Sequence, residues 1–241
     1  MEQGTCKLCG NFGDLEESHI IPEAFYKPLY DEKYHQFFRF EHAQRPKRFR
    51  KGLYESLLCP TCEDITGNYD DYAIKIWNGT ETKAQYYPYT NMLVTTGVDY
   101  TKMKLFFVTT LWRMGVSTLP DFAHLSLGIN HENKIRQMIR NNNPGKQHEY
   151  PILLFGARKD PCIREIMPGL ITNFGPSRIS GHRVYSFIIG SLMWLYFVSN
   201  HTNNTLQKEH CSLKEDGVLV VYQEDELIKN NILKSGGIFK Q

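Results

Sequence analysis

The stretch Cys59-Pro60-Thr61-Cys62 repeats the spacing of Cys6-Lys7-Leu8-Cys9 near the start of the chain. Both have the form C-x-x-C, and Gly10 after the first pair suits a tight turn in which two sulfurs face one ion. Four thiolates complete the tetrahedral coordination of a structural Zn²⁺. The alternatives are a redox C-x-x-C, which needs only one pair, or two chance pairs; the doubled spacing favours zinc. The predicted metal ligands are Cys6, Cys9, Cys59 and Cys62.

The composition is that of an ordinary globular protein. The chain has 241 residues, of which 41% are hydrophobic and 22% charged, and these values exclude disordered, collagen-like and coiled-coil proteins. A formal net charge of +2 excludes a histone-like protein but permits a local basic patch. The N-terminus lacks the apolar stretch of a secretory signal, and the most apolar run, 185–199, is too short to span a bilayer comfortably. We therefore expect a cytoplasmic protein with no membrane partner, in which paired cysteines bind metal.

The cysteines also suggest how the chain is organised. Four of the six lie within the first 62 residues, so we predict an α+β protein with a small zinc-bound module over 1–78. A polar connection over 79–99 would lead to a mixed α/β domain over 100–241, which has no catalytic motif. That domain is expected to select a target, to form homo-oligomers or to dock a protein partner. Hydrophobic patterns there predict helices at 100–116, 131–141 and 224–234, and strands at 151–157, 184–189, 192–198 and 218–222.

Two elements of the N-terminal module can be predicted from its sequence. The run Glu17-Ser18-His19-Ile20-Ile21-Pro22 predicts a short strand that projects His19 from one face. The second C-x-x-C leads into a predicted helix from Glu63 to about Trp77. The apolar face of this helix is expected to consist of Ile65, Tyr69, Tyr72 and Ile76.

The order of these motifs resembles that of the HNH endonucleases of the zinc-stapled ββα-metal, or treble-clef, type. The matching elements are C-x-x-C-G, the His-Ile-Ile-Pro strand and Leu-Cys-x-x-Cys, and they cover residues 1 to about 77. The resemblance implies metal-dependent hydrolysis of phosphodiester bonds in DNA, with RNA a less favoured substrate. It places His19 in the position of the general base that activates water. It also implies a setting such as bacterial anti-phage defence.

Three positions depart from the family pattern. The residue before the base is often a metal ligand but here is Ser18, and Tyr54 stands where the middle Asn is expected. Glu63 replaces the closing His, and its carboxylate is a suitable oxygen ligand for Mg²⁺ or Mn²⁺. The predicted catalytic residues are therefore His19 and Glu63. The alternatives are that His19 is a structural strand histidine, and that the protein is a non-catalytic treble-clef zinc module that binds nucleic acid or protein within a larger assembly.

A basic and aromatic segment lies between the predicted strand and the second cysteine pair. Four phenylalanines are interleaved with Lys and Arg over residues 37–51. Clustered basic side chains neutralise phosphates, and flat rings stack on bases or sugars, so the segment is expected to bind nucleic acid. The alternative is a solvated surface loop. The predicted nucleic-acid-binding residues are Arg39, Arg45, Lys47, Arg48, Arg50 and Lys51.

Overall fold

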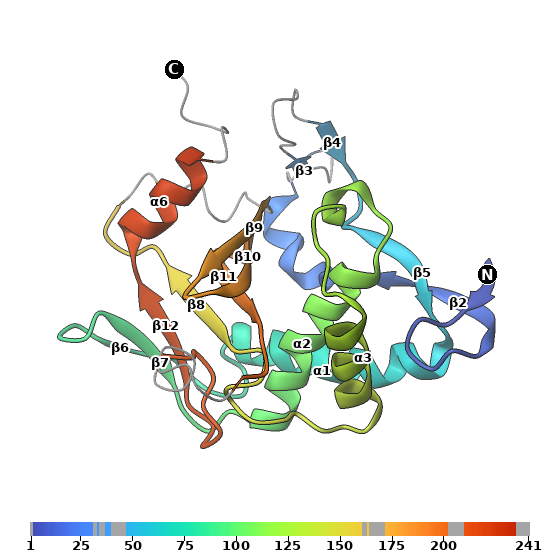
Figure 1. The fold of residues 1–241 in the computed structure, drawn as a ribbon. Helices are drawn as coiled ribbons and strands as arrows, with labels where there is room; N and C mark the ends of the chain where they lie inside the picture. The colour runs from blue at the N-terminus through green and yellow to red at the C-terminus, as the bar shows by residue number, and fades with distance from the viewer. Residues whose placement is uncertain are drawn as a thin grey trace.

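A computed structural model describes residues 2–30, 33, 37–39, 47–160, 163, 172–201 and 210–234 (Figure 1). In this part of the chain there are four α-helices, and the α+β class predicted from the sequence is confirmed. The helices are α1 (Pro60–Trp77), α2 (Tyr100–Val116), α3 (Ile129–Arg140) and α6 (Asp225–Lys234), and three short 3-10 helices are η1 (Glu23–Phe25), η2 (Lys27–Leu29) and η3 (Pro120–Phe122).

The N-terminal region contains a three-stranded antiparallel sheet in the order β1-β2-β5. Its strands are β1 (Glu2–Thr5), β2 (Phe12–His19) and β5 (Tyr54–Leu58). A separate hairpin of β3 (Phe37–Arg39) and β4 (Lys47–Phe49) lies between β2 and β5 in the sequence. The predicted strand around His19 is thus shifted: β2 ends at His19 instead of continuing to Pro22. Ile20 and Ile21, which follow the strand, are both buried in the core.

Helix α1 begins three residues before the predicted start, because Pro60 is well suited to the first turn of a helix. Its predicted apolar face is partly wrong, since Ile65 is 36% exposed. The second cysteine pair determines the rotation of the helix, because Cys62 must face the other three cysteines. The buried residues of α1 are Cys62, Thr66, Tyr69, Ala73 and Ile76.

Among the described residues after α1, seven strands form one sheet in the order β6-β7-β12-β8-β11-β10-β9. All neighbouring pairs are antiparallel except β12 and β8. The strands are β6 (Gln85–Tyr87), β7 (Met92–Thr95), β8 (Ile152–Gly156), β9 (Thr172–Ile179), β10 (His182–Ile189), β11 (Leu192–Val198) and β12 (Leu219–Gln223). The four strands predicted for the C-terminal region are confirmed as β8, β10, β11 and β12. Segment 79–99, expected to be a connection, supplies β6 and β7 at one edge of this sheet.

Strand β9 forms the other edge and was not predicted. The sequence Gly175-Pro176 in its middle argues against a strand, because proline cannot donate a backbone hydrogen bond. An edge strand tolerates this, since one of its sides has no partner to receive such a bond.

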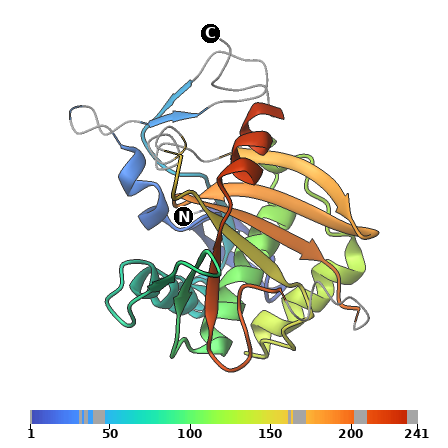
Figure 2. The same cartoon turned by 90° about the vertical axis from the view of Figure 1, so that its left-hand side faces the viewer.

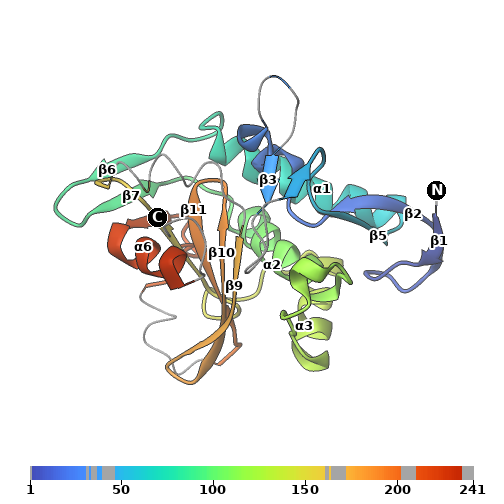
Figure 3. The ribbon, with the colours of Figure 1, turned by 90° about the horizontal axis from the view of Figure 1, so that it is seen from above.

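Helices α2 and α3 cover one side of the seven-stranded sheet, and α6 covers the other (Figures 1, 2 and 3). Every residue of α2 from Met103 to Met114 is buried, because this helix lies between the sheet and α1. The ring of Phe25, from the N-terminal region, packs edge-on against Trp77 and Trp194 at 5.0 and 5.9 Å between centroids. One cluster of buried side chains therefore runs from the cysteine-rich region into the sheet.

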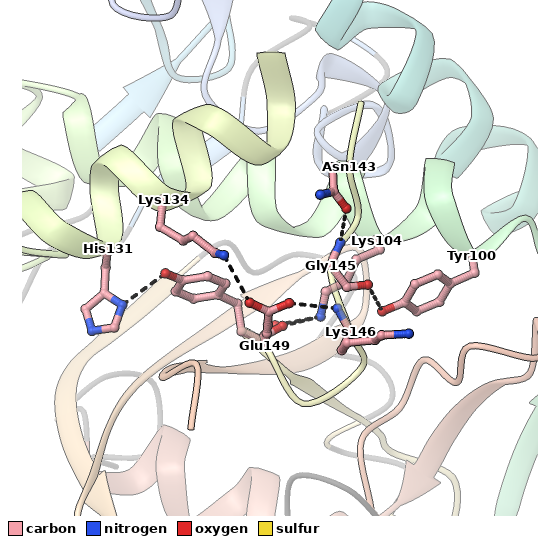
Figure 4. Close-up of polar contacts among 9 residues, drawn as sticks. Tyr100, Lys104, His131, Lys134, Asn143, Gly145, Lys146 and Glu149 are labelled. Carbon is pink, nitrogen blue, oxygen red and sulfur yellow. Dashed lines mark hydrogen bonds and ion pairs between the residues drawn. The ribbon is translucent and has the colours of Figure 1, made fainter. Parts of the chain in front are cut away.

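The loop between α3 and β8 is held by polar contacts (Figure 4). The buried Nζ of Lys104 donates to the carbonyl oxygens of Glu149 and Tyr150, at 2.6 and 3.1 Å. The hydroxyl of Tyr100 donates to the carbonyl of Gly145 at 3.1 Å. Burial lowers the pKa of Lys104 to about 8. These contacts join α2 to the loop that precedes β8.

None of the helices in the described ranges is both long and apolar enough to cross a bilayer.

Candidate metal centre and the surface around His19

The four cysteines of the two C-x-x-C pairs lie together, as predicted. Their sulfur atoms are all within 4.8 Å of one another, and the Sγ atoms of Cys9 and Cys59 are 3.8 Å apart. A tetrahedral site with Zn–S bonds of about 2.3 Å requires sulfurs about 3.8 Å apart, so this set fits a structural Zn²⁺. The first pair comes from the turn between β1 and β2. The second comes from the N-terminus of α1, where Cys59 is the N-cap residue.

Backbone amides prepare these sulfurs for a metal. Gly10 has a φ of +85° and its N–H donates to the carbonyl of Cys6 at 2.9 Å, which closes the turn. The N–H of Asn11 donates to Cys9 Sγ at 3.5 Å. Burial alone would raise the pKa of Cys6, but backbone N–H groups of Cys9 and Cys59 outweigh burial and lower it to about 7. A thiolate, the form that binds zinc, is therefore accessible near neutral pH.

His19 is the last residue of β2 and is paired with Tyr54 of β5. Its side chain is 39% exposed, and its Nε2 lies 3.2 Å from Oε2 of Glu23. The centroids of the His19 and Tyr54 rings are 6.4 Å apart, and Lys51 Nζ lies 4.9 Å from the Tyr54 centroid. His19, Tyr54 and Lys51 therefore form one accessible surface, called here the His19 face.

Ser18 and Glu63 make a different contact. Ser18 is fully buried, and its Oγ donates to Oε2 of Glu63 at 2.6 Å. Neighbouring residues of a strand project to opposite faces, which explains why Ser18 meets α1 while His19 pairs with Glu23. The two predicted catalytic residues thus have separate partners.

This arrangement bears on the predicted catalytic metal. Within the described ranges, the four cysteines are the one group of three or more His, Cys, Asp or Glu side chains placed to hold an ion. Glu63 has the hydroxyl of Ser18, a poor ligand, as its hydrogen-bond partner. The residues around Glu63 consequently do not provide a ligand set for Mg²⁺ or Mn²⁺.

The predicted nucleic-acid-binding residues are only partly within the described structure. The backbone of β3 pairs with that of β4, with Arg39 opposite Lys47 and Phe38 opposite Arg48. Arg50 and Lys51 follow β4 and are exposed, and Lys51 Nζ lies 3.4 Å from a carboxylate oxygen of Glu17. The prediction for Arg45 lies outside the described residues, as do the side chains of Arg39, Lys47 and Arg48.

Sequence reasoning missed two residues beside His19. Glu23 lies four positions after His19, directly after Pro22, and this spacing at the start of a helical turn was a usable signal. Tyr30 donates its hydroxyl to Glu23 Oε1 at 2.6 Å, and no sequence pattern marks it.

Comparisons with protein-family models, with curated proteins and with solved structures gave no match to this chain. Its function has to be inferred from the residues of the site.

Proposed function

We propose that this protein is an HNH-type endonuclease that hydrolyses phosphodiester bonds in DNA, with His19 as the general base. The observation that carries the proposal is the position of His19. Its imidazole is accessible at the end of β2, beside the carboxylate of Glu23, and shares a surface with Lys51. A histidine that acts as the base in this reaction needs a ring that water can reach and a carboxylate partner. It also needs a nearby cation that interacts with the phosphate.

The order of the elements adds support. A turn with two cysteines is followed by two antiparallel strands and a helix that carries the second cysteine pair in its first turn. This is the order that the resembled endonucleases use to hold their base. The exposed residues Arg50 and Lys51 continue the basic hairpin toward β5, so a DNA backbone gripped by the hairpin would pass close to His19.

The reaction can be described for the residues present. His19 takes a proton from water, and the water oxygen attacks phosphorus as the bond to the leaving oxygen breaks. The leaving oxygen takes a proton from solvent, and Glu23 balances the positive charge on the imidazole. Lys51 interacts with the non-bridging oxygens of the phosphate. In related chemistry a divalent ion stabilises the leaving oxygen. No step is assigned to such an ion here, because no group of ligand side chains that includes Glu63 is found among the described residues.

Nicking of supercoiled plasmid tests the proposal. Wild type, His19→Ala and the control His124→Ala, which changes an exposed histidine in another loop, are compared with Mg²⁺, with Mn²⁺ and with EDTA. We expect His19→Ala to lose on the order of 10²- to 10⁴-fold in rate with unchanged zinc content, and His124→Ala to cut like wild type. Equal cutting by His19→Ala would contradict the assignment of the base.

The second candidate is a non-catalytic zinc module that binds nucleic acid or protein within a larger assembly. The Ser18–Glu63 hydrogen bond favours it, because this contact occupies the carboxylate predicted to hold a catalytic ion. The candidate predicts that wild type binds DNA but cuts none under any metal condition, and that His19→Ala binds equally well. Cutting that depends on His19 excludes it.

A further inference from the structure

Glu23 has one carboxylate oxygen directed at His19. This oxygen, Oε2, lies 3.2 Å from His19 Nε2 and is covered from solvent, and it has no hydrogen-bond partner among the described residues. A buried carboxylate oxygen without a donor costs free energy, and His19 Nε2 at 3.2 Å is a ring nitrogen close enough to supply one. The contact thus favours one orientation of the histidine ring.

The other carboxylate oxygen is held from the opposite side. Tyr30 donates its hydroxyl to Oε1 of Glu23 at 2.6 Å. Burial raises the pKa of Tyr30, and the hydrogen bond to Glu23 raises it further, so the phenol keeps its proton at neutral pH. Glu23 is therefore fixed between a permanent donor and the imidazole.

Close packing against Gly52 covers one oxygen of the same carboxylate. Gly52 is buried, and a Cβ atom there would lie 2.8 Å from Glu23 Oε2 and 2.7 Å from the ring of Tyr26. The missing side chain lets the backbone between β4 and β5 lie directly over the carboxylate. The Glu23 side chain as a whole is 36% exposed, so the covering is confined to the oxygen that faces His19.

We infer that Glu23 is a positioning residue that holds the neutral His19 ring with its proton on Nε2, so that Nδ1 is the atom that accepts a proton. A carboxylate beside one ring nitrogen selects the tautomer with hydrogen on that nitrogen. The catalytic consequence rests on the proposed function: a water proton moves to Nδ1, the water oxygen bonds to phosphorus, and the bond to the leaving oxygen breaks as that oxygen takes a proton from solvent. Glu23 then stabilises the imidazolium.

Nitrogen NMR of ¹⁵N-histidine-labelled protein tests the inference without any assay of cutting. The His19 signals are identified by their absence in His19→Gln, and spectra are recorded near pH 8.5, where an imidazole is neutral. We expect the Nε2–H tautomer in wild type and in the control Glu81→Ala, which removes an exposed carboxylate that pairs with Lys75. Glu23→Ala should contain both tautomers. An Nδ1–H tautomer in wild type, or an unchanged tautomer in Glu23→Ala, would overturn the inference.

Kinetics separate this inference from the proposed function. Glu23→Ala should lower kcat for nicking by on the order of 10-fold while KM changes little, and Tyr30→Phe should have a smaller effect in the same direction. If wild type cuts and Glu23→Ala cuts equally fast, the positioning role is wrong. If wild type never cuts but the NMR result is as expected, the proposed function fails, while Glu23 is still shown to orient His19.

Discussion

Arg113 of α2 and Asp70 of α1 form an ion pair in which Nη1 and Oδ2 are 2.7 Å apart and the arginine side chain is fully buried. The pair joins segment 1–78 to segment 100–241. Glu55 of β5 adds a second link, because it accepts hydrogen bonds from the hydroxyls of Ser117 and Thr118, each at 2.6 Å. The cysteine-rich region is thereby fixed to the helices that cover the large sheet.

Removing one partner of this ion pair should destabilise the whole chain. Arg113→Met leaves the Asp70 carboxylate among buried groups without its cation, so we expect a loss of about 3 kcal/mol in the free energy of unfolding. Arg113→Met combined with Asp70→Leu should lose less than the single change does, because no unpaired charge remains. Urea unfolding followed by fluorescence measures both; an effect of Arg113→Met below about 0.5 kcal/mol would show that the pair is not a link of this kind.

Purified protein should contain one zinc per chain, because the four sulfurs complete one tetrahedral site. Cys59→Ser should lose the metal and lower the melting temperature of the entire protein, since one buried cluster connects the centre to the sheet. Cys211→Ser is the matched control, a buried cysteine outside the centre, and should retain zinc. Metal analysis and thermal unfolding are the measurements. Folded, zinc-free wild type would contradict the assignment.

Reversing the charge of the basic segment should weaken DNA binding. Lys47→Glu, Arg48→Glu and Arg50→Glu together remove three candidate phosphate contacts, so the slope of log affinity against log salt should fall by roughly one unit per contact. The control reverses three exposed lysines elsewhere, at Lys75, Lys102 and Lys146, for the same change in net charge. Fluorescence anisotropy at several salt concentrations measures both proteins. Equal slopes would identify the segment as a solvated loop.

Stability should depend on pH through Lys104. Its pKa is lowered from 10.5 to about 8 by burial, so between these values the unfolded chain binds more protons than the folded one. The free energy of unfolding should therefore rise as the pH increases above 8. This gain in stability is lost again as the pH falls through 8. Relative to Lys104→Met, wild type should gain about 2 kcal/mol between pH 7 and pH 9.5. If the free energy of unfolding changes with pH in the same way for wild type and Lys104→Met, the lysine is charged and solvated.

Replacing Gly52 by alanine should lower the stability of the protein, whereas the same change at Gly67 should raise it. Gly52→Ala introduces a Cβ that must displace the carboxylate of Glu23 or the ring of Tyr26, so we expect a loss of about 1–3 kcal/mol in stability and a slower nicking rate. Gly67 lies inside α1, and a new Cβ there would meet no atom within 4 Å apart from its chain neighbours and the backbone of its own helix, so Gly67→Ala should stabilise the protein by up to about 1 kcal/mol. Gly52→Ala with wild-type stability would mean that the packing around Glu23 is loose.

The cysteine centre could be predicted from the sequence because ligand type and spacing are local properties that the metal imposes. The positions of Ser18 and Glu63 could not, because their hydrogen bond joins residues 45 positions apart and depends on how α1 is rotated against β2. The burial of Cys62 fixes that rotation, whereas helical periodicity alone suggested a face that included Ile65. Strand β9 was missed for a similar reason, since an edge position that tolerates Pro176 is known only once the neighbouring strands are in place.

The two halves of the cysteine centre are far apart in the sequence, since Cys9 and Cys59 are separated by 50 positions. On the ribosome, a nascent chain that has emerged only as far as residue 58 carries two of the four sulfurs and cannot complete the tetrahedral site. The strand that ends at His19 and the helix that packs against it can therefore be locked together only after the second pair emerges. Synthesis itself delays assembly of the centre, so a short translation product that stops before Cys59 would carry His19 and the basic hairpin without the structure that holds them.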